Sequence, residues 1–123
     1  EALVLMGHGT EHYADAVYAA LDYQFKDLEH SNIFMGTVEG YPTLESVMRL
    51  VQKAGYRHVV LAPFMIVAGD HANNDLAGDE EDSWKSVFEA AGFSVRCVLK
   101  GLGEYADIRK LLLSHAEKAM EQV

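Results

Sequence analysis

Two histidines and one glutamate follow three successive apolar segments of this 123-residue chain at nearly equal spacing. His8 lies in GHGT after the apolar run ALVLM, Glu39 follows the segment 33–38, and His71 lies in GDHANND after HVVLAPF. The intervals between them are 31 and 32 residues. Imidazole and carboxylate groups bind divalent ions such as cobalt, iron, nickel or zinc, and imidazole also exchanges protons near neutral pH. The pattern predicts a metal or acid–base site to which each repeat contributes one side chain.

The segments around these residues alternate between short apolar runs and amphipathic stretches, which predicts strands and helices in turn. Strands are expected at 2–6, 33–38, 58–64 and 94–99, and helices at 12–29, 42–55, 80–91 and 105–120. The polar segment Gly69–Asp79 has the composition of a functional loop. Right-handed crossovers between the strands then give an α/β fold, a single domain over residues 1–123. We expect a flavodoxin-like, four-stranded, mostly parallel sheet in the order 2-1-3-4, with helices on both faces. Four strands are few for such a sheet, which suggests half of a pseudo-symmetric protein or a subunit that needs a partner.

The carboxyl ends of parallel strands meet at one edge of the sheet, where ligands of open α/β folds bind. His8, Glu39 and His71 are therefore expected at that edge. His12, four residues after His8, is expected to cap or support the site instead of binding metal, because Gly9 keeps His8 in a loop. The acidic residues of the polar segment are weaker candidates for binding a hard cation.

Composition excludes several classes of function. Ten Lys and Arg against nineteen Asp and Glu leave a net charge of −9, which would repel nucleic acid. The longest apolar stretch, Val59–Gly69, contains Pro63 and is shorter than the roughly 20 residues of a membrane span. The single cysteine, Cys97, fits a reducing compartment, so a cytoplasmic location is expected. The chain begins at Glu1 without a starting methionine, as a trimmed sequence would, and a removed upstream targeting segment stays open.

Three nucleotide and hydrolase motifs are missing from the sequence. It contains no G-x-x-x-x-G-K-[ST] phosphate loop, no G-x-G-x-x-G dinucleotide fingerprint and no G-x-S-x-G nucleophile elbow. ATP hydrolysis through a P-loop, dinucleotide binding and α/β-hydrolase chemistry are therefore not indicated.

Longer motifs resemble those of the class II chelatases, specifically the anaerobic sirohydrochlorin cobaltochelatases of cobalamin biosynthesis. They are MGHGTEH at 6–12, GTVEGYP at 36–42, LAPFMIVAGDHANNDLAGD at 61–79, DSWK at 82–85 and KGLGE at 100–104. The resemblance implies a lyase that inserts Co²⁺ into the tetrapyrrole sirohydrochlorin without ATP. It also implies that His8, Glu39 and His71 are catalytic and face the metal. No cofactor is expected beyond the metal being inserted, which is Co²⁺ or alternatively Fe²⁺ or Ni²⁺.

The resemblance covers only the C-terminal half of the two-domain chelatases. A full cleft would need an N-terminal half or a second copy of this chain, since short chelatases of this size form homodimers. Sirohydrochlorin carries eight carboxylates, whereas this chain is acidic, so local positive groups such as Lys85 and Lys100 are expected to contact it.

Three alternatives remain open at this point. The first is an iron chelatase for sirohaem or haem, which relative rates of Co²⁺ and Fe²⁺ insertion would distinguish. The second is a receiver-like or flavodoxin-like module that binds phosphate with the loop 7–10, which stabilisation by phosphate or flavin would reveal. The third is a truncated domain that binds metal but is inactive without its N-terminal half, which adding that half would test.

Overall fold

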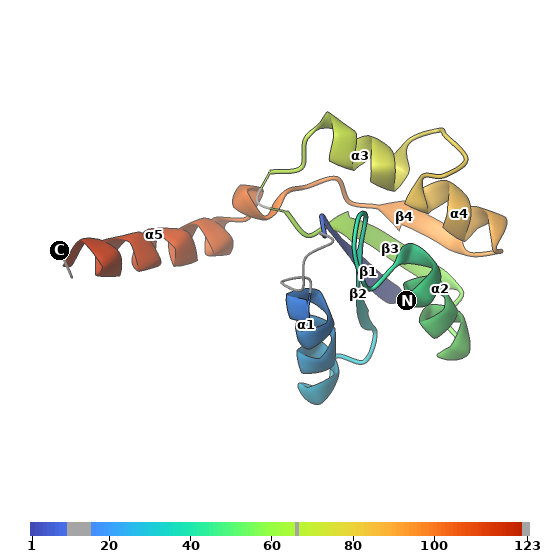
Figure 1. Cartoon of the computed structure of the whole chain (residues 1–123), viewed down its shortest axis with the longest axis horizontal. Helices are drawn as coiled ribbons and strands as arrows, with labels where there is room; N and C mark the ends of the chain where they lie inside the picture. The colour runs from blue at the N-terminus through green and yellow to red at the C-terminus, as the bar shows by residue number, and fades with distance from the viewer. Residues whose placement is uncertain (10–15, 66, 122–123) are drawn as a thin grey trace.

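The computed structural model describes residues 1–9, 16–65 and 67–121, and it shows a parallel sheet flanked by helices (Figure 1). The strands are β1 (Ala2–Gly7), β2 (Ile33–Thr37), β3 (His58–Pro63) and β4 (Ser94–Cys97). The helices are α1 (Ala16–Asp27), α2 (Leu44–Lys53), α3 (Asp70–Ala77), α4 (Trp84–Ala90), the 3₁₀ helix η2 (Leu102–Glu104) and α5 (Ala106–Glu121). The four strands are ordered β2-β1-β3-β4. The predicted α/β class and strand order are confirmed.

The core lies on one face of the sheet, because alternate side chains of a strand point to opposite faces. Val4 is in register with Phe34 on β2 and with Leu61 on β3, so these three side chains share a face. They are buried against apolar side chains of α2, α3 and α4, namely Leu44, Val47, Val51, Leu76, Trp84 and Phe88. The sheet and these three helices therefore form one continuous hydrophobic core.

Local capping defines where two of the core helices begin. The Thr43 hydroxyl accepts a hydrogen bond from the Ser46 N–H at the start of α2, and the Ser83 hydroxyl accepts one from the Ser86 N–H at the start of α4. Each bond satisfies a backbone donor that has no partner within its helix. After α2, Gly55 adopts a φ of +89°, the left-handed conformation that ends helices at glycine.

Two predictions about secondary structure are wrong. The segment Gly69–Asp79, expected to be a loop, contains the helix α3. Its Asn and Asp residues favour loops, but Leu76 is fully buried and holds the segment against the core, so tertiary packing overrides local preference. The helix expected at 80–91 begins only at Trp84, where the Ser83 cap starts it. Predicted strand ends at 64 and 99 are also too late by one and two residues.

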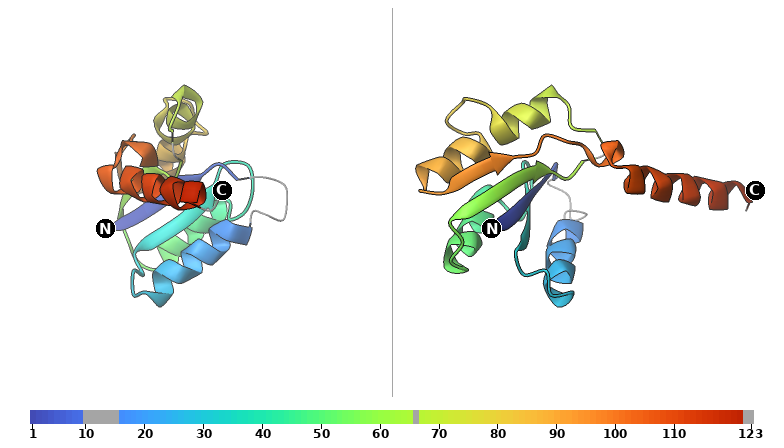
Figure 2. Two further views of the ribbon diagram at one scale, coloured as in Figure 1. Left: turned by 90° about the vertical axis from the view of Figure 1, so that its left-hand side faces the viewer. Right: turned by 180° about the vertical axis from the view of Figure 1, so that it is seen from behind.

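Helices α1 and α5 differ from α2, α3 and α4, the helices that cover the core. The predicted helix 12–29 is observed as α1, and its first residues, including His12, lie outside the described residues. Helix α5 extends away from the sheet, as Figure 1 and the right-hand view of Figure 2 show. Among the helices that the structure describes, none is long and apolar enough to cross a membrane.

Candidate functional site

His8 and Glu39 are neighbours at the carboxyl edge of the sheet. The hydrogen-bond pattern between β1 and β2 continues beyond the strands: the Val38 N–H donates to the Gly7 carbonyl at 3.0 Å, and the Glu39 N–H donates to the His8 carbonyl at 3.0 Å. Both side chains are exposed. The structure therefore brings together two of the three predicted site residues through the backbone that carries them.

Thr37 organises the turn that carries Glu39. This residue is only 2% exposed, and its backbone N–H and its hydroxyl both donate to the Pro42 carbonyl, at 2.7 and 3.1 Å. The same hydroxyl accepts a hydrogen bond from the Gly40 N–H at 3.0 Å. These bonds fold residues 37–42 into a tight turn with Glu39 near its tip. A buried hydroxyl thus positions an exposed carboxylate.

Gly9 allows the loop after β1 to lie against this turn. Its φ is +80°, and a Cβ atom there would lie 2.6 Å from the Thr37 Cβ and 2.8 Å from the Gly40 nitrogen. Its N–H donates to the Tyr18 hydroxyl on α1 at 3.3 Å. Glycine at this position therefore permits a close approach of the turn that carries Glu39.

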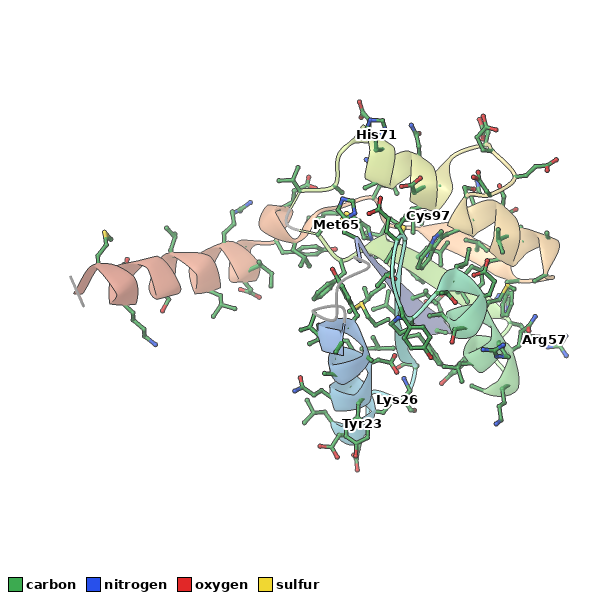
Figure 3. The ribbon with its side chains drawn as sticks, in the orientation of Figure 1. Tyr23, Lys26, Arg57, Met65, His71 and Cys97 are labelled. Carbon is green, nitrogen blue, oxygen red and sulfur yellow. The ribbon has the colours of Figure 1, made fainter. Side chains whose placement is uncertain are left out.

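His71 lies on a separate element of the same edge. It is the second residue of α3, it is exposed, and Figure 3 shows it at the beginning of that helix. Within the described ranges, no three His, Cys, Asp or Glu side chains are close enough to hold a metal ion together. The structure thus pairs His8 with Glu39 and leaves His71 apart, so joint binding of one metal by all three stays a prediction.

A cavity of about 290 Å³ lies beside the turn that carries Glu39. It is lined by Thr37, Val38, Gly40, Thr43, Leu44, Glu45, Asp75, Asp82 and Trp84. Three of these residues are carboxylates, so the cavity is negative and disfavours a ligand that carries carboxylates of its own.

Four exposed apolar side chains follow elements that end toward this edge, and sequence reasoning missed them. Tyr41, Val67, Leu99 and Tyr105 are 61%, 79%, 47% and 37% exposed, and they follow β2, β3, β4 and η2. The Lys100 ammonium lies 4.2 Å from the centre of the Tyr105 ring. Their position in the sequence could have indicated them, because each of the four follows an element that ends toward this edge.

The two lysines expected to contact substrate carboxylates have different surroundings. Lys100 lies between β4 and η2, where it contacts the exposed Tyr105 ring. Lys85 lies in the first turn of α4 and forms an i,i+4 ion pair with Glu89 at 4.0 Å. Only Lys100 shares the edge with exposed apolar side chains, which makes it the stronger candidate for contact with an anionic, flat ligand.

Among solved structures, the chain resembles a putative cobalamin (vitamin B12) biosynthesis CbiX protein from Marinobacter aquaeolei VT8. The TM-score is 0.74, and the match covers 99% of this chain and 98% of that chain at 15% sequence identity. At this identity, the likeness supports the four-stranded α/β fold alone.

Two sequence relatives have a much higher identity to the chain. It is 42% identical over 120 residues to the sirohydrochlorin cobaltochelatase of Salmonella typhimurium, and 38% identical over 120 residues to the sirohydrochlorin cobaltochelatase CbiKC of Nitratidesulfovibrio vulgaris. Each match covers 98% of this chain but only 45% and 42% of the relatives. The chain therefore spans less than half the length of these relatives.

A family model describes nearly the whole chain. Residues 1–121 match the model of the cobalt chelatase (CbiK) family, a range that includes His8, Glu39 and His71 together with every strand and helix described above. The chain belongs to the cobalt chelatase (CbiK) family.

Proposed function

We propose that this chain forms one wall of a chelatase site that inserts Co²⁺ into sirohydrochlorin, without ATP, for cobalamin biosynthesis. The observation that carries the proposal is 42% identity to the Salmonella sirohydrochlorin cobaltochelatase across 98% of this chain. The pairing of His8 and Glu39 at the carboxyl edge of the sheet supports it, because a metal-binding group and a proton acceptor are then adjacent.

Insertion requires that the macrocycle lose two N–H protons while the metal loses water and passes to the pyrrole nitrogens. An imidazole such as that of His8 or His71 can accept a proton from the macrocycle and can also bind the incoming ion. The Glu39 carboxylate adds negative charge beside His8, which favours binding of the dication. An open arrangement of exposed ligands suits transfer, since a closed set of ligands would retain the metal.

The surface around these residues supports binding of a flat macrocycle. The exposed side chains of Tyr41, Val67, Leu99 and Tyr105 offer apolar area at the edge, and Lys100 offers a positive charge for a peripheral carboxylate. Divalent metal and tetrapyrrole are the substrates, and no further cofactor is proposed. A second wall is supplied by an N-terminal half or by a second copy of the chain, and the reaction takes place in the cytoplasm.

The test is anaerobic insertion of Co²⁺ into sirohydrochlorin, followed by absorption spectroscopy. We expect turnover above the nonenzymatic rate, and we expect Glu39→Gln and His71→Ala each to reduce it to that rate. Because both side chains are exposed, the thermal midpoint of each variant should stay unchanged. The matched control is Glu45→Gln, an exposed carboxylate that lines the neighbouring cavity, which should keep full activity.

Three results would each contradict part of the proposal. Full activity in His71→Ala would remove that residue from the site. Absence of turnover both for the chain alone and after addition of a separately made N-terminal half would remove the activity itself. Faster insertion of Fe²⁺ than of Co²⁺ would reassign the metal while leaving the site in place.

A further inference from the structure

Helix α1 contributes little to the core of the sheet. None of its twelve residues is buried, and among the described residues no side chain of α1 belongs to the buried core or to the apolar side chains packed against it. The partly shielded side chains of α1 share one side of the helix, at the spacing of successive turns: Tyr18, Leu21, Asp22 and Phe25. That side faces β2, where the Asp22 carboxylate accepts a hydrogen bond from the Met35 N–H. Core formation therefore does not explain what α1 contributes.

Tyr18 contacts the loop that carries His8 on both sides of that residue. Its ring lies directly against Gly7, because a Cβ atom at Gly7 would lie 2.9 Å from Cδ1 of the ring and closer still to Cε1. Its hydroxyl accepts a hydrogen bond from the Gly9 N–H at 3.3 Å. One side chain of α1 thus holds the residue before His8 by packing and the residue after it by a hydrogen bond.

The opposite side of the same loop rests on the turn that carries Glu39. The carbonyls of Gly7 and His8 accept hydrogen bonds from the N–H groups of Val38 and Glu39, each at 3.0 Å. The backbone of residues 7–9 therefore lies between α1 and the turn 37–42. The exposed His8 imidazole is attached to a backbone that both elements hold, so its place beside Glu39 depends on both.

The hydroxyl of Tyr18 has a specific part in this arrangement. In the described ranges, the Gly9 N–H donates to no acceptor other than this oxygen. Gly9 is half-buried, so loss of the acceptor would leave its N–H incompletely hydrated and would favour movement of the loop toward water. Packing against Gly7 alone does not fix Gly9, because the ring contact and the hydrogen bond act on different residues.

We infer that Tyr18 is a positioning residue for His8. Its ring and hydroxyl hold residues 7–9 against the turn that carries Glu39, so the imidazole and the carboxylate stay adjacent. Tyr18 acts through the backbone of the loop, and no contact with metal or tetrapyrrole is assigned to it. The effect on catalysis rests on the proposed function, whereas the hold on the loop does not. Two measurements separate these parts.

The first measurement is solvent exchange of backbone amides by NMR. Tyr18→Phe keeps the ring and removes the acceptor, so exchange at the Gly9 N–H should rise about fivefold, the factor that corresponds to a hydrogen bond of about 1 kcal/mol. Exchange at Met35, which Asp22 holds, should stay unchanged. The matched control is Tyr23→Phe, which removes a hydroxyl from a 71% exposed side chain in the half of α1 away from His71 (Figure 3). It should change neither amide.

The second measurement is steady-state insertion of Co²⁺ into sirohydrochlorin. A displaced His8 binds the incoming metal less well, so Tyr18→Phe should raise the KM for Co²⁺ about fivefold and leave the KM for sirohydrochlorin unchanged. A mere loss of folded protein would lower the apparent kcat and change neither KM. Tyr18→Leu, which also loses the ring on Gly7, should have a larger effect on the KM for Co²⁺, and Tyr23→Phe should have none.

The two measurements fail in different ways. Unchanged exchange at Gly9 in Tyr18→Phe would overturn the hold on the loop, whatever reaction the chain catalyses. Faster exchange at Gly9 together with an unchanged KM for Co²⁺ would overturn the positioning of His8. A chain that inserts no Co²⁺ even after addition of an N-terminal half would contradict the proposed function, and exchange at Gly9 would then decide the hold on the loop by itself.

Discussion

On the face of the sheet toward α2, α3 and α4, β1 contributes Ala2, Val4 and Met6, and all three are 0% exposed. On the opposite face of the same strand, Leu3 and Leu5 remain partly exposed. The flanking helices differ in the same way: α2 has four buried residues in ten, whereas α1 has none in twelve. The two faces of β1 thus differ in burial, and the face toward α2, α3 and α4 supplies the core.

The comparison extends to the carboxyl edge. Glu39 and His71 are exposed, but the turn that carries Glu39 is held by the buried Thr37 and the helix that carries His71 is held by the buried Leu76. These exposed side chains are therefore positioned by buried residues close to them in the sequence. Binding groups can change at such an edge with little effect on the stability of the fold.

The largest expected effect contrasts one apolar residue from each face. Phe88→Ala should lower the free energy of unfolding by about 3–5 kcal/mol, because the ring is fully buried and packs edge-to-face on Phe93 with centroids 5.2 Å apart. Leu5→Ala should cost only about 1 kcal/mol in the monomer, since part of that side chain already contacts water. Urea denaturation of dilute protein measures both. Equal losses would contradict the difference between the faces.

The second prediction compares two glycines. A Cβ at Gly36 would lie 2.8 Å from Cγ2 of Val47 and 2.9 Å from the Trp84 ring, both buried, so Gly36→Ala should cost about 1–3 kcal/mol. A Cβ at Gly7 would instead meet the Tyr18 ring on α1, a helix that no buried residue holds. Gly7→Ala should therefore displace α1 at a cost of at most about 1 kcal/mol. Hydrogen exchange checks this, since only Gly7→Ala should increase exchange selectively in α1.

The strands could be predicted because each is a short apolar run in the sequence, and their order because crossover connections have a preferred hand. ALVLM and HVVLAPF are continuous apolar runs, which suit strands covered on both faces, and right-handed crossovers limit the order of four such strands. The adjacency of His8 and Glu39 followed from the same reasoning, since both residues follow neighbouring parallel strands. Helix α3 could not be predicted, because one buried leucine among Asn and Asp residues gives almost no periodic signal.

The placement of α5 and the surroundings of His71 needed the structure. An amphipathic pattern shows which side of a helix is apolar and does not show what covers that side. The exposed residues Tyr41, Val67, Leu99 and Tyr105 were missed for a related reason. From sequence alone, an apolar side chain is predicted to lie in the core. Only a structure shows whether it is buried there or exposed at the edge of the sheet.

The third prediction concerns how α1 is held on the sheet. The Asp22 carboxylate accepts a hydrogen bond from the Met35 N–H of β2 at 3.0 Å and forms an ion pair with Lys26 at 2.8 Å. Asp22→Ala leaves the buried Met35 N–H without this partner and should lower the free energy of unfolding by about 1 kcal/mol. Asp27→Ala, an exposed position on the same helix, is the matched control and should change it by less than about 0.5 kcal/mol. A control as costly as Asp22→Ala would show that the effect comes from helix charge and not from this contact.

The smallest expected effect is a change in the free energy of unfolding at alkaline pH, and it depends on the burial of Cys97. Cys97 packs against the core, and burial raises the pKa of its thiol above the ordinary value of 9.0, an effect that Lys85 partly offsets. The folded chain therefore keeps the thiol proton to higher pH than the unfolded chain does. The contribution of this group to stability is complete below pH 9 and is lost as pH rises through the folded-state pKa. Urea denaturation between pH 8 and 11 should show that the free energy of unfolding declines less steeply with pH in Cys97→Ala than in the unchanged chain. Other groups titrate alike in both proteins, so the difference reports Cys97. Identical slopes would mean that burial does not raise the pKa of the Cys97 thiol.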